Sequence, residues 1–351
     1  MSKLASRARR LDALARLLIA SVLCALGTVT AAAAEKDKRV DPAPENLAKV
    51  NQTVISADEY ERAFALAVRQ KYYHAQVPEH EVQALRNEVA DALINRVLLL
   101  EEAKRRNLQP DRDAIKRTIA GYEERYRASE QWKKNRKQMI AAVSAELEAQ
   151  SRLQRLEQAV RQVPEANEQQ AREFYDGHKT LFVEPEQVRL SLILLRVDPA
   201  SPQAIWDKAT DEASAIVGRL RKGADFRELA RLHSADPSAE RGGDLGYLHR
   251  GMLPEGTQSL IDSLSPGALS DPIRLLEGVA VLRLEDRKPA AQHAFAGVRR
   301  RAGELWQREQ GEAQWQRLIA QLREKALIHI NTSRYPGLEQ LAAQERRSTA
   351  P

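Results

Sequence analysis

Apolar residues recur at every third or fourth position through much of the first half of the chain. The clearest run follows Pro78 and comprises Val82, Leu85, Val89, Leu93, Val97 and Leu100. This spacing places the apolar side chains on one face of a helix and charged residues on the other. We therefore predict a long helix that ends near Asn107. The same pattern predicts helices at Tyr60 to Val68, Ile115 to Tyr122 and Met139 to Val163.

The pattern changes after Glu184-Pro185, which breaks the helical spacing. Residues Val188 to Val197 are mostly aliphatic over the length of a strand, so we predict a buried strand there. Residues Val279 to Leu284 predict a closing strand in the same way. The other predicted elements are helices at 168–179, 206–222, 225–232 and 295–325 and a short strand-like end at 327–330.

The segment 35–49 is charged and contains Pro42 and Pro44, so we predict a flexible leader there and ordered structure from Val50 onward. Ser56 and Glu59 have the spacing of a capping box, in which each side chain bonds the other residue's backbone N–H at the start of a helix. From Val50 to residue 183 we expect only helices.

The first 34 residues have the three parts of a secretory signal. A basic start ends at Arg16, an apolar run follows from Leu17 to Leu26, and small residues end at Ala34. We predict export to the periplasm with cleavage near Ala34. The alternative is an uncleaved anchor, since Leu17 to Ala34 is about the shortest length that spans a bilayer, and this segment is then the only part to contact the membrane.

Five of the 55 basic residues and one of the 49 acidic residues precede Glu35, so the formal charge falls from +6 to +2 without them. Such a balance does not indicate a nucleic-acid partner. Cys24 is the only cysteine, and the bulky Leu23 before it disfavours lipid attachment. Cleavage near Ala34 removes the thiol and with it any disulfide or cysteine metal site. We predict no metal and no cofactor.

Several short blocks occur in a fixed order between Gly223 and Pro289. They read Gly223-Ala224-Asp225-Phe226, Ser234-Ala235-Asp236-Pro237-Ser238, Gly242-Gly243-Asp244-Leu245-Gly246, Arg250-Gly251, Ser265-Pro266-Gly267 and Asp271-Pro272. This region resembles the parvulin-type (PpiC, rotamase) peptidyl-prolyl isomerase domain. The resemblance implies a domain at 184–289 with a small antiparallel sheet surrounded by helices.

The helical segment before it resembles the N-terminal chaperone module of SurA- and PrsA-type exported foldases. The residues that carry this resemblance are Val50-Asn51, Ile55-Ser56, Leu93-Ile94 and Arg105-Arg106-Asn107-Leu108. It implies an α+β protein in which a helical module at 50–183 is completed by a helix at 290–332, with the isomerase-like domain inserted and a tail at 333–351. The alternative is an ordinary helical bundle without a client groove.

Rotation about an X-Pro bond crosses a barrier of about 18–20 kcal/mol. A catalyst needs no metal or nucleophile, but it must hold the proline in an apolar pocket and stabilise the twisted amide. In parvulins a histidine on the first strand and another on the last strand face each other. Here the matching positions hold Leu192 and Ala280, so we expect weak catalysis at most.

The resemblance assigns the remaining site positions. Asp236 matches the acid or thiol and is the catalytic candidate, while the substrate-binding candidates are Leu192, Met252, Leu253, Ser270 and Ala280. The usual pocket phenylalanine is missing from Pro254-Glu255-Gly256-Thr257. Asp236 also fits a turn or helix cap, and Met252 and Leu253 also fit a core. His233 and His249 match no site position and receive no role.

Two functions remain open from the sequence. One is an exported peptidyl-prolyl isomerase and foldase-chaperone that acts on unfolded or proline-containing exported polypeptides, including secreted or outer-membrane proteins. The alternative is a non-catalytic periplasmic holdase, or an accessory of a secretion system, in which the parvulin-like domain is only a scaffold.

Overall fold

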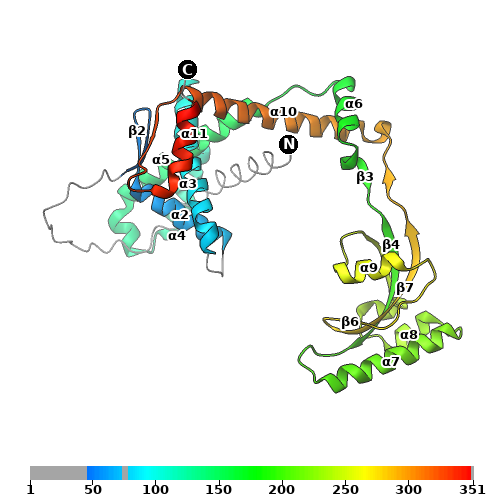
Figure 1. Ribbon diagram of the computed structural model, residues 1–351. Coiled ribbons are helices and arrows are strands. Elements are labelled where there is room, and N and C mark those ends of the chain that lie inside the picture. The colour runs from blue at the N-terminus through cyan, green and yellow to red at the C-terminus, as the bar shows by residue number, and fades with distance from the viewer. Residues whose placement is uncertain (1–45, 73–77, 349–351) are drawn as a thin grey trace. The chain divides into compact units, whose positions relative to one another are not determined.

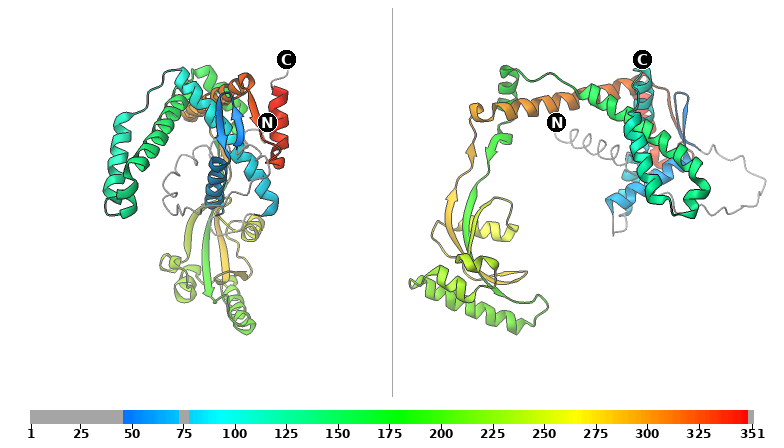
Figure 2. Two further views of the ribbon diagram at one scale, coloured as in Figure 1. Left: turned by 90° about the vertical axis from the view of Figure 1, so that its left-hand side faces the viewer. Right: turned by 180° about the vertical axis from the view of Figure 1, so that it is seen from behind.

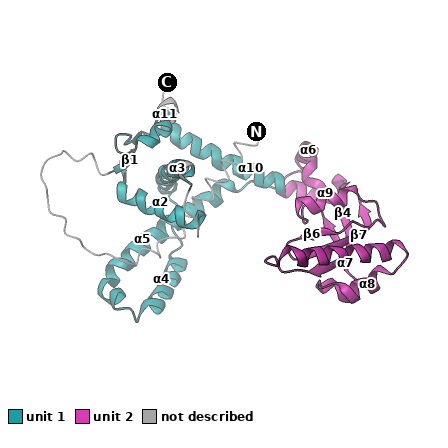
Figure 3. Ribbon diagram, turned by 60° about the horizontal axis from the view of Figure 1, so that its bottom comes forward, with its two compact units in different colours: residues 1–165, 305–351 teal, residues 166–304 magenta. Residues whose placement is uncertain are grey.

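The structure, a computed structural model, describes residues 46–72 and 78–348. The predicted signal segment, Cys24 and the first part of the predicted leader lie outside the described residues. The chain divides into two compact units (Figure 3). Unit 1 comprises Met1–Glu165 and Leu305–Pro351, and unit 2 comprises Ala166–Glu304. Unit 1 is therefore built from two chain segments, and unit 2 from one.

Unit 1 is mostly helical (Figure 1). Its helices are α2 (Ala57–Lys71), α3 (Glu79–Arg105), α4 (Arg112–Tyr126), α5 (Glu130–Arg161), the later part of α10 (Phe295–Lys325) and α11 (Glu339–Ser348), with a 3₁₀ turn η4 (Pro336–Leu338). The predicted helices are confirmed. Ser56 caps α2 by accepting the Glu59 N–H at 3.1 Å, and the predicted face of α2 packs inward through Tyr60, Phe64 and Val68.

Unit 1 also contains a three-stranded sheet, so the expectation that it holds only helices was wrong. The order is β2 (Thr53–Ser56), β1 (Asn46–Val50), β9 (Ile328–Ile330), and both pairings are antiparallel. Strand β1 begins four residues before the predicted start at Val50, because Leu47 and Ala48 are buried in the core. The predicted strand-like end at 327–330 is confirmed as β9.

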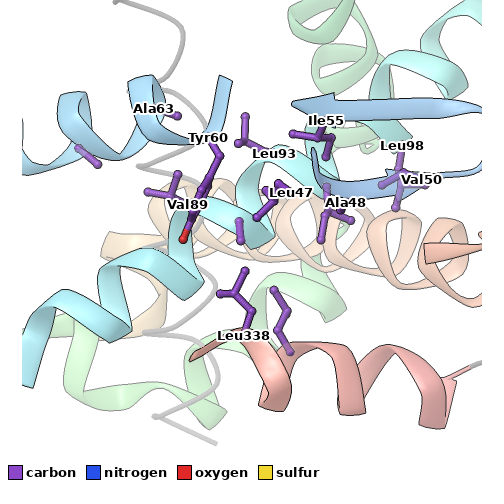
Figure 4. Close-up of a cluster of buried hydrophobic side chains, with 14 of the residues drawn as sticks. Leu47, Ala48, Val50, Ile55, Tyr60, Ala63, Val89, Leu93, Leu98 and Leu338 are labelled. Carbon is purple, nitrogen blue, oxygen red and sulfur yellow. The ribbon is translucent and has the colours of Figure 1, made fainter. Parts of the chain in front are cut away.

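The sheet, α2, α3 and the C-terminal segment enclose one apolar core (Figure 4). Tyr60, Leu47 and Ile94 are fully buried in it, and Leu338 contributes from near the other end of the chain. A second cluster joins α3, α5 and α10. Helix α4 packs along the first part of α5 as a helical hairpin (Figure 2), with the rings of Tyr126 and Trp132 5.7 Å apart.

Unit 2 contains two small sheets. Its helices are α6 (Glu168–Gly177), α7 (Gln203–Arg221), α8 (Phe226–His233), α9 (Glu255–Ser263) and the start of α10, with 3₁₀ turns η2 (Lys179–Phe182) and η3 (Pro237–Arg241). Its strands are β3 (Val183–Glu184), β4 (Gln187–Arg196), β5 (Asp244–His249), β6 (Ile273–Leu275), β7 (Gly278–Lys288) and β8 (Ala291–Gln292). The mixed α+β class is confirmed.

The main sheet of unit 2 has the order β5-β4-β7-β6 and is antiparallel throughout. Side chains alternate between the two faces of a strand. One face of β4 and β7 packs with α7 and α8 around Ile193 and Phe226. The other face packs with α9 around Leu190 and Ile261. Both faces of the central strands are therefore covered, which explains the nearly continuous apolar run that predicted β4.

Within the described part of the chain, none of the helices combines the length and the apolar character needed to cross a bilayer.

Candidate functional site

The two positions expected to carry histidine lie on the α9 side of the main sheet. In the strand register Leu192 pairs with Leu282 and Ala280 pairs with Leu194, so Leu192 and Ala280 are diagonal neighbours on one face. Leu192 is 8% exposed and Ala280 is 0% exposed. Ile261 of α9 belongs to the same packed cluster. These positions therefore contribute to a core, and neither side chain can donate a hydrogen bond to an amide.

Asp236 lies at the start of η3 and caps it, since its Oδ1 accepts the Ser238 N–H at 2.8 Å. The surrounding segment is bonded to β4. The Ala235 N–H donates to the Leu194 carbonyl at 2.8 Å, and the Leu192 N–H donates to the Gly243 carbonyl at 2.8 Å. Asp236 is half-buried and lies next to the strand that carries Leu192. Asp236 therefore acts as the N-cap of η3, and its carboxyl group lies beside the candidate site.

The other candidate residues separate into buried and exposed groups. Ser270 is 1% exposed, and its Oγ accepts the Leu282 N–H at 2.9 Å, so its hydroxyl supports β7. Leu253 is partly buried against the cluster that contains Leu192 and Ala280. Met252 is 57% exposed in the turn before α9. The structure thus brings Leu192, Ala280 and Leu253 together and places Met252 at the surface.

The Gly-Gly-Asp-Leu-Gly block has a structural explanation. Asp244 accepts from Arg189 Nη2 at 2.5 Å and from the Gly246 N–H at 2.9 Å, which joins β5 to β4. The Arg189 guanidinium, helped by the Gly246 N–H, holds the pKa of Asp244 below its usual value. Gly243 has a φ of +84° and lies against the Leu192 carbonyl.

The two histidines of this region lie outside the candidate site. His233 ends α8, and its Nδ1 is 3.3 Å from a Glu212 carboxylate oxygen. His249 ends β5 and is exposed. Among the described residues, no group of three or more histidine, cysteine, aspartate or glutamate side chains could hold a metal ion.

Sequence reasoning missed a charged cluster in unit 1, where it interpreted Arg105-Arg106-Asn107-Leu108 only as a helix end. Glu102 is 4% exposed, accepts from Arg105 Nε at 2.7 Å and also from Arg106 Nε at 2.6 Å. The hydrogen bond from Arg105, followed by that from Arg106, lowers the pKa of Glu102 to about 2. The sequence spacing could have revealed this cluster. Glu102 precedes Arg105 by three residues and Arg106 by four, and residues at these separations lie on the same face of a helix.

Comparison with known proteins identifies both parts of the chain. Residues 193–286 match the PPIC-type PPIASE domain (Rotamase), and residues 11–146 match the SurA-like N-terminal domain. The chain therefore combines a PpiC-type domain with a SurA-like helical domain. The resemblance inferred from the sequence blocks is confirmed.

Curated relatives carry the name Chaperone SurA. The one from Alcanivorax borkumensis is 29% identical over 70% of this chain and 58% of its own length. The one from Pseudomonas aeruginosa is 31% identical over 35% of this chain and 30% of its own length. The chain thus spans less than two thirds of these relatives.

Two solved structures resemble parts of the chain. A crystal structure of a PpiC-type peptidyl-prolyl cis-trans isomerase domain is 28% identical, with 31% of this chain and 97% of that chain covered and a TM-score of 0.29. A SurA-like chaperone of Campylobacter jejuni is 19% identical, with 78% of this chain and 94% of that chain covered and a TM-score of 0.34.

Proposed function

We propose that the protein is an exported chaperone that binds unfolded polypeptides, and that its PpiC-type domain retains weak isomerase activity at most. The observation that carries this proposal is the burial of Leu192 and Ala280 in an apolar cluster with Ile261. A face filled by core side chains leaves little room for a proline ring. It also lacks the hydrogen-bond donors that stabilise a twisted amide.

The helical unit then carries most of the function. Curated relatives of the chain bear the name Chaperone SurA, and the match of residues 11–146 to the SurA-like N-terminal domain supports binding of unfolded exported chains, including secreted and outer-membrane polypeptides. Export fits the basic, apolar and small-residue parts of the first 34 residues. We place the working protein in the periplasm after cleavage near Ala34.

Residual isomerase activity is the second candidate, and Asp236 is the observation that favours it. Its Oδ1 is occupied by the cap, but Oδ2 has no hydrogen-bond partner within the described ranges 46–72 and 78–348. A half-buried carboxylate next to β4 could still act electrostatically on a bound amide. This role requires the charge, whereas the cap requires only an oxygen acceptor.

The test measures chaperone and isomerase activity on the same preparation. We expect the protein to suppress aggregation of an unfolded outer-membrane polypeptide at near-equimolar ratios. We expect proline-limited refolding to be accelerated about 100-fold less than by a parvulin with both histidines, because loss of one electrostatic donor commonly costs about 100-fold or more in rate. Failure to suppress aggregation would contradict the chaperone proposal.

Asp236→Asn separates the two roles of this side chain, since it keeps an oxygen for the Ser238 N–H and removes the charge. If weak isomerisation depends on the carboxylate, this variant loses it while aggregation suppression is unchanged. Asp271→Asn is the matched control, because Asp271 is 82% exposed and pairs with Arg221 at the surface. Fast isomerisation that Asp236→Asn abolishes would favour an enzyme over a holdase.

A further inference from the structure

A cavity of about 510 Å³ lies in unit 1 at the carboxyl-terminal ends of α3 and α10. Its volume is within the usual range of about 300–1,000 Å³ for ligand pockets. The residues that line it are Asn51, Leu98, Glu101, Glu102, Arg105, Arg106, Leu318, Gln321, Leu322, Lys325 and Ala326. All of them belong to unit 1.

Both acidic side chains of this cavity are already engaged. Glu102 accepts from Arg105 and Arg106, as described above. Glu101 accepts from Asn51 Nδ2 at 2.7 Å and from Thr53 Oγ1 at 3.1 Å. Three cations thus face two carboxylates, and the lining carries one excess positive charge.

Lys325 is the cation that remains available. It is exposed, and across the part of the chain that the structure describes its ammonium forms no ion pair. The Arg105 side chain is 73% exposed and the Arg106 side chain 36% exposed, although both bond Glu102. The positive groups are therefore accessible to a ligand, whereas Glu102 is buried below them.

Leucine side chains supply the apolar part of the lining. Leu98 is 3% exposed and Leu318 is 8% exposed, and Leu322 is partly buried beside them. Cations near a helix carboxyl terminus stabilise the helix dipole, which accounts for basic residues at these positions. Helix stabilisation does not account for a cavity that combines an uncompensated cation with leucine side chains.

We infer that this cavity binds a short segment of an unfolded client in which a carboxylate side chain lies beside aliphatic side chains. The carboxylate contacts Lys325 and the outer N–H groups of Arg105, and the aliphatic side chains contact Leu322, the partly exposed leucine of the lining. We assign the bound carboxylate to an internal acidic residue of the client, because an unfolded chain has many such residues and only one carboxyl terminus. This inference rests on the proposed chaperone function and gives it a sequence preference.

Three labelled peptides with acetylated amino ends test the inference by fluorescence anisotropy with the purified protein. The first has a central Leu-Glu-Leu and an amidated end, the second replaces Glu by Gln, and the third keeps Gln but has a free carboxyl end. We expect the first to bind about two- to fivefold more tightly than the second, as exposed ion pairs allow. Added salt should reduce that difference. Preferential binding of the third peptide, or equal binding of all three, overturns the inference.

Lys325→Gln should remove most of the preference for the acidic peptide and leave binding of the Gln peptide unchanged. Lys104→Gln is the matched control, because Lys104 is an exposed cation on α3 outside the lining. Arg105→Gln is the second variant, and circular dichroism confirms that each variant is folded. An unchanged preference in both Lys325→Gln and Arg105→Gln overturns the inference.

Aggregation of a full-length unfolded client is measured in parallel. If the protein suppresses aggregation but binds all three peptides equally, the proposed binding role of the cavity is refuted and the proposed chaperone function stands. If the unaltered protein does not suppress client aggregation, the proposed chaperone function itself is contradicted. The two failures therefore give different results.

Discussion

Gly243 allows the segment that carries Asp236 to lie close to β4. Its φ is +84°, and a Cβ atom at this position would lie 2.5 Å from the Leu192 carbonyl oxygen. Gly246 has a similar φ of +73°, yet a Cβ atom there would have no neighbour within 4 Å. Both glycines therefore adopt a left-handed backbone conformation, but only Gly243 also lies in close contact with another backbone segment.

We expect Gly243→Ala to lower the unfolding free energy of unit 2 by about 3 kcal/mol, since it adds a steric clash to the left-handed conformation. Gly246→Ala should cost only about 1–2 kcal/mol, because it adds the conformational cost alone. Hydrogen exchange of the β4 and β7 amides measures both. Equal losses would mean that the contact with the Leu192 carbonyl is relieved by a small backbone shift.

Sequence resemblance suggested candidate site positions, but it could not give their surroundings. It identified Leu192 and Ala280 as replacements for histidine, and the structure adds that α9 packs against them through Ile261. It assigned Ser270 to substrate binding, whereas the hydroxyl bonds the Leu282 N–H. Packing and hydrogen bonding depend on residues far apart in sequence, so a motif match leaves them undetermined.

At the scale of elements, the end of α3 is stabilised by a buried acid between two arginines. Glu102 has a pKa of about 2 against an ordinary value of 4.5, owing first to the hydrogen bond from Arg105. A lowered pKa in the folded state means that the charged form stabilises the fold. This contribution is complete above about pH 4.5 and is lost as the pH falls toward 2.

We expect Glu102→Gln to reduce the unfolding free energy of unit 1 at pH 7 by about 1–3 kcal/mol, the upper value being discounted because Arg105 is solvent-exposed. The difference from the unaltered protein should narrow at pH 3, because this carboxyl is then already protonated in the unfolded chain although it stays mostly ionised in the fold. Urea denaturation at the two pH values measures it. Glu124→Gln, at a site that is 70% exposed, is the control; a loss at pH 3 as large as at pH 7 would contradict the assignment.

The long helices were predictable because their signal is local, as the α3 pattern from Val82 to Leu100 illustrates. Strand β1 was missed because only one of its two partner strands is close to it in the sequence. It pairs with β2 through a short turn, but its other partner, β9, brings Ile328 opposite Val50. The charged residues of the predicted leader also hid the signal of Leu47, which is buried in a core that includes a residue as distant as Leu338.

At the scale of the whole molecule, each unit has its own apolar core. Leu338, which is 1% exposed, belongs to the core of unit 1, and Leu229, which is 2% exposed, belongs to a core of unit 2. Leu338 lies in η4, next to Gly337, whose carbonyl accepts from Gln83 Nε2 at 2.8 Å. The C-terminal segment is thereby anchored to α3.

We expect Leu338→Ala to destabilise unit 1 by about 2–4 kcal/mol, the usual cost of a buried Leu→Ala change. Amide protection of β4 and β7 in unit 2 should be unaffected. Leu229→Ala is the reciprocal control and should lower protection in unit 2 alone. Hydrogen exchange read by mass spectrometry resolves the two regions, and equal loss of protection in both units from either variant would show that they unfold together.

The division of unit 1 into two chain segments has a consequence for the order of events during biosynthesis. Residues 166–304 form a contiguous unit and can fold before the residues that follow them have been synthesised. The core of unit 1 must wait for Ile328 to pair with Val50 and for Leu338 to fill its place. The edge of β1 that pairs with β9 and the part of α3 that contacts η4 are therefore covered last, and a chain that ends before residue 328 leaves both of them exposed.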